Sequence, residues 1–244
     1  HSFAADLEGD GIQEVLAGGT IYEADGATRC MAAEMNGYPA VADLDGDGFG
    51  EIVVTGYDVV RVLEHDCSQT ASWAVLDGGN GGPAALADFD GGGAIEIGVA
   101  GLIAYTVYEA DGTVLWSQPS TDISSGSTSS IAFDFEGDGA AEVVYGDESR
   151  LWVFDGATGT PRVEHGWRNS GTRNEQPAVA DIDGDGSAEI VVTNDQGDPG
   201  IYVLEDAEGR WADARPVWHQ HAFHPSMVAD DLTILPPDLG SVAG

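Results

Sequence analysis

Short apolar runs recur along this chain, and acidic, glycine-rich turns separate them. In the clearest unit, Ala178–Asp181 leads through such a turn into Glu189–Thr193 and then into the alternating run Ile201–Leu204. Short runs rich in β-branched residues and bounded by glycine and aspartate are typical of β-strands. After a further turn comes a fourth run, which often carries a tryptophan, as at Trp73, Trp116 and Trp218. Each unit is therefore predicted to contain four antiparallel strands.

The same unit occurs five times. Its acidic turn begins at Asp6, Asp43, Asp88, Asp134 and Asp181, so the period is about 37 to 47 residues. A period of this size indicates a solenoid, a propeller or an array, and four antiparallel strands per period favour a propeller blade. A parallel β-helix would need shorter repeats, and no segment has a sustained helical period. The sequence predicts an all-β fold, namely a β-propeller with five complete four-stranded antiparallel blades and a C-terminal remnant; part of a six- or seven-bladed ring is the alternative.

The 244 residues are predicted to form a single β-propeller domain. Small residues in the first strand of a unit, such as Ala40, Ala85 and Ala178, suit the crowded axis of a propeller. The approximate blades are residues 1–37, 38–82, 83–128, 129–175 and 176–224. Residues 225–244 are expected either to close the ring or to begin a partial blade.

Each acidic turn carries the same arrangement of nine residues. We number these positions 1 to 9 and call the turns loops 1 to 5 in chain order. Loop 5 reads Asp181-Ile182-Asp183-Gly184-Asp185-Gly186-Ser187-Ala188-Glu189, with acids at positions 1, 3, 5 and 9 and glycine at positions 4 and 6. Loop 3 departs from this pattern because it has Gly92 at position 5, and loops 1 and 4 have Glu8 and Glu136 at position 3.

Alternate residues of a tight loop point the same way, so the acids at positions 1, 3 and 5 are expected to converge, and the glutamate at position 9 closes the cage. Ca²⁺ takes roughly six to eight oxygen ligands at about 2.3–2.6 Å and accepts irregular geometry. Position 7 would add a backbone carbonyl, which explains why its side chain varies. Up to five Ca²⁺ ions are expected, with the loop of residues 88–96 binding most weakly. The predicted ligands are Asp6, Glu8, Asp10, Ile12 and Glu14; Asp43, Asp45, Asp47, Phe49 and Glu51; Asp88, Asp90, Ala94 and Glu96; Asp134, Glu136, Asp138, Ala140 and Glu142; and Asp181, Asp183, Asp185, Ser187 and Glu189.

Other kinds of site fit these loops less well. An EF-hand needs its glutamate at position 12 and a helix on each side. Mg²⁺ demands near-ideal octahedral geometry, and the loops contain no cysteine or histidine to bind zinc. Plain hairpin turns are the remaining alternative, but a turn needs one Asp-Gly pair rather than four acids at fixed spacing. Four carboxylates in one small loop would repel one another without a cation.

The segment Pro177–Val192, which contains loop 5, resembles the FG-GAP or VCBS repeat, the calcium-bearing blade of integrin α-subunit propellers and of many secreted bacterial proteins. The resemblance covers nearly the whole chain, and Arg215–His224 resembles the end of such arrays in large secreted bacterial proteins. It implies calcium ligands at positions 1, 3, 5, 7 and 9, in loops that lie on one rim between the first and second strands of each blade. It implies little about a specific activity, because the family includes adhesion heads, lectins and scaffolds of polysaccharide lyases.

The chain is strongly acidic. It has 43 aspartates and glutamates against eight arginines and no lysine, which gives a formal net charge of −35. Five Ca²⁺ ions of two charges each would bring this only to −25, so most of the excess lies on the surface. Such a surface disfavours nucleic acid and anionic membranes, and no run is long and apolar enough to insert into a bilayer. Because weak calcium sites are typical of extracellular modules, the protein is predicted to be secreted or to lie at the cell surface.

Two functions without catalysis are consistent with these features. The first is a ligand-binding or adhesion module for an extracellular glycan or protein, bound by the connections between blades on the rim opposite the loops. The longest connections are Ser117–Ser130 and His165–Gln176. The second connection offers side chains that suit a sugar or a carboxylate, namely Trp167, Arg168, Asn169, Arg173 and Asn174; ordinary loops are the alternative. The second function is a structural spacer or assembly domain of a larger secreted protein.

A third function is a polysaccharide lyase or hydrolase on a propeller scaffold, which needs a general base beside a charge-neutralising group. Nearly all the acidic clusters are committed to the loops, and no nucleophile elbow or phosphate loop occurs. No catalytic residue is therefore assigned, and the chain is expected not to be an enzyme. His219, His221 and His224 form the one histidine cluster, which either binds a transition metal or lies partly buried in a closing strand.

Cys30 and Cys67 fall in neighbouring predicted blades. Outside the cell, two such cysteines can form a disulfide between the blades. Two free thiols are the alternative, and either state fits the sequence.

Overall fold

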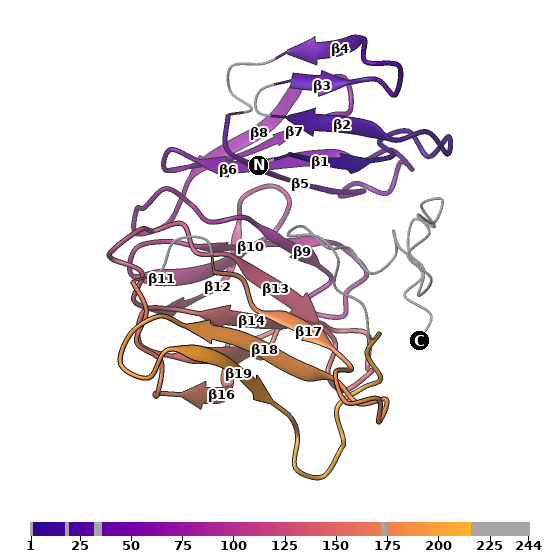
Figure 1. Ribbon diagram of the computed structural model, residues 1–244. Coiled ribbons are helices and arrows are strands. Elements are labelled where there is room, and N and C mark those ends of the chain that lie inside the picture. Colours follow the sequence, from indigo (N-terminus) through magenta and orange to yellow (C-terminus); the bar gives the residue numbers. More distant parts are fainter. Residues whose placement is uncertain (1, 18–19, 32–35, 172–174, 216–244) are drawn as a thin grey trace.

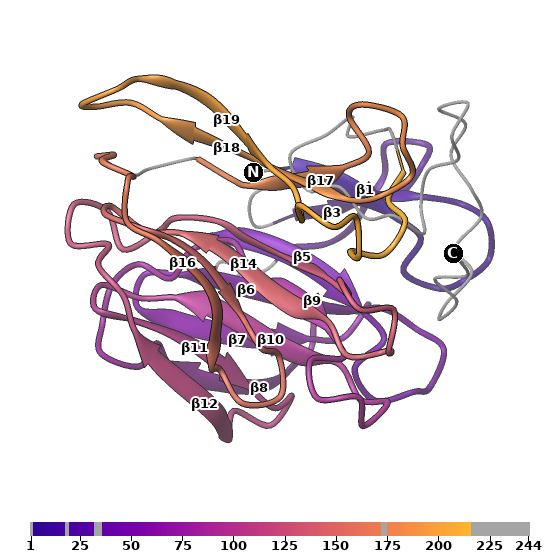
Figure 2. The same ribbon diagram turned by 90° about the horizontal axis from the view of Figure 1, so that it is seen from below.

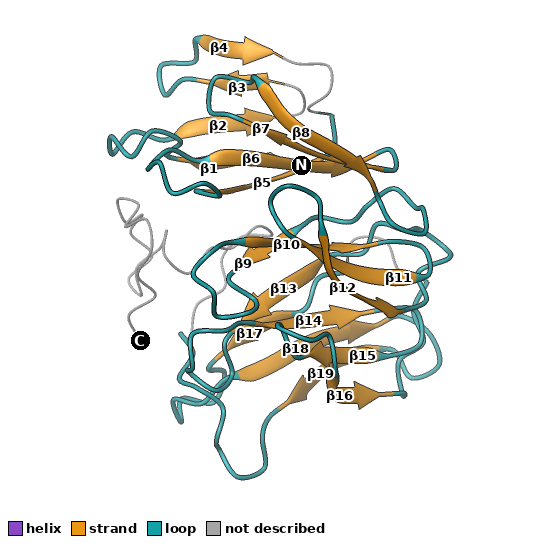
Figure 3. Ribbon diagram, turned by 180° about the vertical axis from the view of Figure 1, so that it is seen from behind, coloured by secondary structure: helices purple, strands orange, loops and turns teal. Residues whose placement is uncertain are grey.

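The computed structural model describes residues 2–17, 20–31, 36–171 and 175–215. These residues form strands β1 to β19 in five antiparallel sheets, and no helix occurs among them (Figure 3). These ranges accordingly contain no helix that is long and apolar enough to cross a membrane. The prediction of an all-β fold is confirmed, and the five sheets correspond to the five predicted blades.

Each sheet is one blade, and its strands follow one another in chain order. Blade 5 has three strands in the described residues; its expected fourth strand, with Trp218, and the expected remnant 225–244 lie outside them. The strands are β1 (Ser2–Ala5), β2 (Glu14–Ala17), β3 (Thr20–Tyr22) and β4 (Thr28–Met31) in blade 1; β5 (Tyr38–Ala42), β6 (Glu51–Gly56), β7 (Val59–Leu63) and β8 (Gln69–Ala74) in blade 2; β9 (Ala85–Ala87), β10 (Glu96–Ala100), β11 (Ala104–Tyr108) and β12 (Val114–Pro119) in blade 3; β13 (Ser130–Phe133), β14 (Glu142–Gly146), β15 (Leu151–Phe154) and β16 (Pro161–His165) in blade 4; and β17 (Ala178–Ala180), β18 (Glu189–Asn194) and β19 (Gly200–Leu204) in blade 5.

The first two strands of a blade occupy its most crowded positions. The first strand β9 lies beside the first strands β5 and β13 of the neighbouring blades. Alanines such as Ala85 and Ala87 allow this close approach, as the sequence pattern predicts. The second strand is buried along its whole length in β6, β10 and β14, because its two faces are covered by different blades (Figure 1).

Alternate residues of one second strand belong to two different cores. Ile52 and Val54 of β6 lie in one apolar cluster with Leu16 of blade 1, whereas Val53 lies in another with Ile97 of blade 3. Successive side chains of a strand point to opposite faces, which produces this division. Similar clusters join blade 3 to blade 4 and blade 4 to blade 5, and Figure 2 shows the stacked sheets from below. Each fully buried aliphatic side chain stabilises the fold by about 1.5–3 kcal/mol.

The two cysteines are joined by a disulfide. Cys30 lies in β4 and Cys67 in the turn between β7 and β8, and their Cα atoms are 6.2 Å apart. The bond connects the outer strand of blade 1 to the turn that precedes the outer strand of blade 2, and the residues it joins are 37 positions apart in the sequence. Of the two alternatives left open by the sequence, the structure has the disulfide.

Candidate metal centres

Each acidic loop joins the first strand of a blade to its second strand. Position 1 directly follows the first strand, and position 9 is the first residue of the second strand in all five blades. In blade 2, for example, Ala42 is the last residue of β5 and pairs with Glu51 across the ladder. Strand pairing therefore fixes both ends of the loop and brings its first and last acids together.

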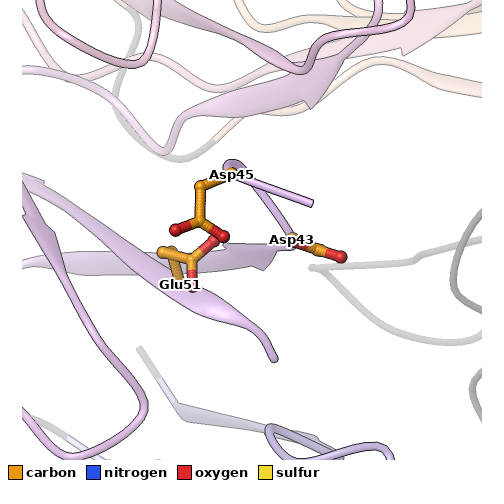
Figure 4. Close-up of side chains that lie close together, drawn as sticks. All are labelled: Asp43, Asp45 and Glu51. Carbon is orange, nitrogen blue, oxygen red and sulfur yellow. The ribbon is translucent and has the colours of Figure 1, made fainter. Parts of the chain in front are cut away.

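Three carboxylates cluster in four of the five loops. In loop 2, ligand atoms of Asp43, Asp45 and Glu51 lie within 4.8 Å of one another (Figure 4). These are positions 1, 3 and 9, and the same positions cluster in loops 3, 4 and 5, at Asp88, Asp90 and Glu96; Asp134, Glu136 and Glu142; and Asp181, Asp183 and Glu189. Among the described residues, the acids of loop 1 (Asp6, Glu8, Asp10 and Glu14) do not form such a cluster.

The backbone of each loop is shaped by its glycines and by the aspartate at position 1. The glycines at positions 4 and 6 have positive φ in all five loops, for example 78° at Gly46 and 92° at Gly48. Side chains with a Cβ rarely adopt this conformation, which explains the glycines. The carboxylate of Asp43 accepts hydrogen bonds from the N–H groups of Gly46 at 2.7 Å and Gly48 at 3.1 Å. The equivalent aspartates of loops 3, 4 and 5 accept bonds from the same two glycine positions, and Asp6 of loop 1 accepts one from Gly11, so position 1 organises the turn.

The acids at position 5 take a different role from those at positions 1, 3 and 9. Asp47 accepts a hydrogen bond from the N–H of Phe49 at position 7, at 2.8 Å, and Asp10, Asp138 and Asp185 accept the equivalent bonds. Loop 3 has Gly92 at position 5 and still forms its cluster of three acids. Calcium coordination by position 5 and by the carbonyls of Ile12, Phe49, Ala94, Ala140 and Ser187 stays a prediction.

The glutamate at position 9 is the most constrained ligand candidate. Its Oε2 atom accepts a hydrogen bond from the N–H at position 2 in every loop: 2.9 Å for Glu14, 2.6 Å for Glu51, 2.7 Å for Glu96, 3.0 Å for Glu142 and 2.7 Å for Glu189. All five glutamates are at most 3% exposed. The Oε1 atoms of Glu51 and Glu189 are buried and have no hydrogen-bond partner among the described residues.

Burial raises the pKa of the position 9 glutamates of loops 2, 3 and 4. Desolvation raises the pKa of Glu51 and that of Glu96 to about 7 each, and that of Glu142 to about 8. The hydrogen bond from the backbone opposes the shift in each case, while neighbouring acids add to it. A buried carboxylate with an unpaired oxygen is costly unless a cation neutralises it. The donor set, made only of carboxylate oxygens, fits a hard divalent ion such as Ca²⁺.

Loops 1 and 4 are contacted by two arginines that the sequence interpretation did not assign to them. Arg29 pairs with Glu8 and Glu14 of loop 1, and Arg162 pairs with Glu136 and Glu142 of loop 4. Each arginine lies more than 14 residues after the loop that it contacts, in or next to the fourth strand of the same blade. A signal was present in the sequence, because the chain has only eight basic residues and these two follow the turn between strands 3 and 4.

A cavity opens beside loop 4. Its volume is about 320 Å³, and it lies between blades 4 and 5. It is lined by acids and Arg162 of blade 4 on one side and by Leu204 and Trp211 of blade 5 on the other. The cavity therefore lies on the rim that carries the loops, whereas the sequence placed the ligand on the opposite rim.

The connection expected to bind ligand is partly buried. Arg168 is 3% exposed and donates hydrogen bonds to the backbone carbonyls of Asp147 and Thr193. Its interpretation as a surface contact is therefore wrong, because these carbonyls hold the guanidinium inside the protein. Trp167 stacks on Tyr202 with ring centroids 4.0 Å apart. Arg173, Asn174 and the cluster His219, His221 and His224 lie outside the described residues.

Comparison with known sequences and structures supports the repeat and the fold. Residues 134–192, which span loops 4 and 5, match the FG-GAP-like repeat. No curated protein sequence matches the chain. The biofilm matrix protein Bap1 from V. cholerae is similar in structure, with a TM-score of 0.79 and 20% sequence identity over 97% of this chain and 68% of Bap1.

Two further solved structures are similar at lower TM-scores. A rhamnogalacturonan lyase from Bacillus licheniformis gives a TM-score of 0.57 at 15% identity, over 88% of this chain and 50% of the lyase. A lectin from Agrocybe aegerita that recognises non-reducing terminal N-acetylglucosamine gives 0.53 at 17% identity, over 93% of this chain and 69% of the lectin. At these identities the likeness concerns the fold, and it agrees with the predicted propeller of FG-GAP or VCBS repeats.

Proposed function

We propose that this β-propeller of FG-GAP-like repeats is an extracellular calcium-binding module that presents a ligand-binding or adhesion surface. The bound ions would fix the loops at one rim and so stabilise the blades that carry them. The ligand would be a glycan or a protein outside the cell. The strong negative charge of the chain agrees with an extracellular calcium-rich setting, where weak sites are occupied.

One observation carries the calcium proposal. The Oε1 atom of Glu51 is buried without a hydrogen-bond partner among the described residues, and ligand atoms of Asp43 and Asp45 lie within 4.8 Å of a Glu51 ligand atom. Without a cation this arrangement destabilises the fold, because the buried carboxylate oxygen has no partner and the two neighbouring acids repel the charge of Glu51. A divalent cation removes both penalties at once.

The proposed class of ligand comes from proteins of similar fold. Similar folds occur in a biofilm matrix protein, in a lectin that recognises terminal N-acetylglucosamine and in a rhamnogalacturonan lyase. These proteins suggest extracellular carbohydrate as the class of ligand to test first. The lining of the cavity between blades 4 and 5 also suits a sugar, because it includes the charged side chain of Arg162 and the aromatic ring of Trp211.

The test has two parts. Titration calorimetry with Ca²⁺ is expected to show binding, with a much weaker response to Mg²⁺; no heat of binding would reject the calcium proposal. A glycan array probed in Ca²⁺ and again after EDTA is expected to show signals that need Ca²⁺. Signals that persist unchanged in EDTA would show that ligand binding does not require Ca²⁺ in the loops.

A structural spacer of a larger secreted protein is the second candidate. The observation that favours it is the burial of Arg168, which removes a contact side chain from the longest connection on the opposite rim. A protein that binds Ca²⁺ tightly and no glycan or matrix protein would fit this candidate better.

A further inference from the structure

We infer that loops 1 and 4 are closed by the chain's own arginines, so that Arg29 and Arg162 take the place of Ca²⁺ there and only loops 2, 3 and 5 bind the ion. The inference rests on the proposed calcium-binding function and narrows it from five sites to three.

The two guanidinium groups lie at the position 9 glutamates. Arg29 Nη2 is 3.3 Å from Glu14 Oε1 and 3.0 Å from Glu8 Oε2. Arg162 Nη1 is 3.1 Å from Glu142 Oε1 and also contacts Glu136 Oε1. In loops 2 and 5, the same Oε1 atom of the position 9 glutamate has no hydrogen-bond partner among the described residues. The arginine therefore occupies the oxygen that is left for a metal ion elsewhere.

Both arginines come from the same place in their blades. The pairing of β3 with β4 skips one residue between Thr28 and Cys30, which is Arg29. The pairing of β15 with β16 skips one residue between Pro161 and Val163, which is Arg162. A bulge turns its extra residue away from the regular ladder, and here it directs the side chain to the loop.

Blades 2 and 3 have the same bulge with a different residue. Thr70 is skipped in the pairing of β7 with β8, and Leu115 in the pairing of β11 with β12. Neither side chain can supply a positive charge to its loop. Blade 5 has no fourth strand among the described residues, so no equivalent residue is identified there. Loop 5 is assigned from the Oε1 atom of Glu189, which is buried without a hydrogen-bond partner among the described residues.

The residue at position 3 changes together with the arginine. Loops 1 and 4 have glutamate there, Glu8 and Glu136, whereas loops 2, 3 and 5 have aspartate. Glutamate is one methylene longer, so its carboxylate can reach the guanidinium that enters from the fourth strand. A glutamate at position 3 and an arginine at the bulge therefore occur together in both blade 1 and blade 4, which indicates that the two residues act as a pair.

Each arginine is surrounded by enough negative charge to hold it. Arg29 also bonds Glu23 at 2.7 Å, and Arg162 also bonds Asp155 at 2.7 Å, so three acids surround each guanidinium. Guanidinium stays charged at any physiological pH and offers five donors in a fixed fork. A divalent ion entering loop 1 or 4 would have to displace this group and would meet its positive charge. In these two loops the arginine therefore offsets part of the negative charge without calcium.

The experiment counts Ca²⁺ ions bound per chain, by equilibrium dialysis with metal analysis, in the whole protein. The wild type is expected to bind three. Arg29→Thr and Arg162→Thr, which copy the residue of blade 2, are each expected to bind four. Arg150→Thr removes an arginine that pairs with Glu164 outside the loops and is expected to bind three. Wild type with five ions, or arginine variants that fold and still bind three, would overturn the inference.

A converse variant covers the case in which an arginine variant fails to fold. Asp45→Glu with Thr70→Arg installs the pair of loops 1 and 4 in loop 2 and is expected to lower the count from three to two; an unchanged count would contradict the inference. Diffraction data from crystals grown in Ca²⁺ identify the sites, with density expected in loops 2, 3 and 5 and not in loops 1 and 4. Wild type that binds no Ca²⁺ at all would instead reject the proposed function, and so the two failures are distinguishable.

Discussion

The indole Nε1–H of Trp116 in blade 3 donates a hydrogen bond to the backbone carbonyl of Gly156 in blade 4. Trp116 is 7% exposed and belongs to the apolar cluster that joins these two blades. A polar group at the edge of an apolar interface fixes how one sheet is placed on the next, because the bond forms in only one relative position of the sheets.

Trp116→Phe keeps an aromatic ring and removes this donor. We expect a loss of about 1 to 3 kcal/mol in the free energy of unfolding, because the carbonyl of Gly156 loses its indole donor. Urea unfolding in Ca²⁺ measures the change. Trp73→Phe is the matched control, since Trp73 Nε1 has no hydrogen-bond partner among the described residues, and it should cost less. Equal losses in the two variants would show that the hydrogen bond contributes nothing.

Removal of Ca²⁺ is expected to lower the melting temperature. Binding to the folded state alone stabilises it by RT ln(1 + [L]/Kd), which is about 2.7 kcal/mol per site when the ion is present at about 100 times its Kd. Thermal unfolding followed by circular dichroism, in Ca²⁺ and after EDTA, measures the effect. A melting curve that EDTA leaves in place would mean that the metal has no structural role.

The loops are expected to differ in their importance for calcium-dependent stability. Asp183→Ala in loop 5 should lower the melting temperature in Ca²⁺ far more than Asp90→Ala in loop 3, because loop 3 has Gly92 in place of an acid. In EDTA, the difference between the two variants should largely disappear. Equal losses in Ca²⁺ would contradict the ranking of loop 3 as the weakest site.

Glu51→Gln should have opposite effects with and without the metal. In EDTA the amide is expected to stabilise the fold, because it removes a buried charge while its oxygen can still accept the hydrogen bond from Leu44 N–H. In Ca²⁺ the same variant should be less stable than the wild type, because loop 2 loses a charged ligand. Urea unfolding in each buffer measures the change in the free energy of unfolding. Destabilisation in both buffers would argue against an unpaired charge at Glu51.

The disulfide should stabilise blades 1 and 2. It closes a loop between residues 37 positions apart, for which the chain-entropy model gives about 3 to 4 kcal/mol. The double variant Cys30→Ser with Cys67→Ser is expected to unfold at a lower urea concentration than the wild type. Reducing agent should lower the midpoint of the wild type and leave that of the variant unchanged. A wild type that is insensitive to reduction would contradict the expected gain.

The strands and loops could be predicted from the sequence because their signals are local. Alternation of apolar residues predicts a strand at Ile201–Leu204, which the structure has as β19 at Gly200–Leu204, and the glycines with positive φ mark each loop. Strand pairing then places the acid at position 9 beside the acid at position 1. These features depend on neighbours within about ten residues, and each is repeated in several blades.

Contacts between distant residues could not be predicted in this way. Arg29 reaches Glu8 across 21 positions, and the contact depends on the bulge in the pairing of β3 with β4. Arg168 was expected at the surface, but the carbonyl of Thr193 from the next blade holds it inside. The pairing of Cys30 with Cys67 likewise depends on how blade 1 packs against blade 2. Tertiary packing decides all three.

The apolar clusters described above each join two consecutive blades. Stability in such an architecture approximates a sum of terms for single units and for nearest neighbours, as in a one-dimensional chain of coupled elements. A change in one unit is then felt by the adjacent units and fades beyond them. Whole units can be added, lost or exchanged while the contact surface is kept, so a single chain can contain both loops that an arginine contacts and loops without one.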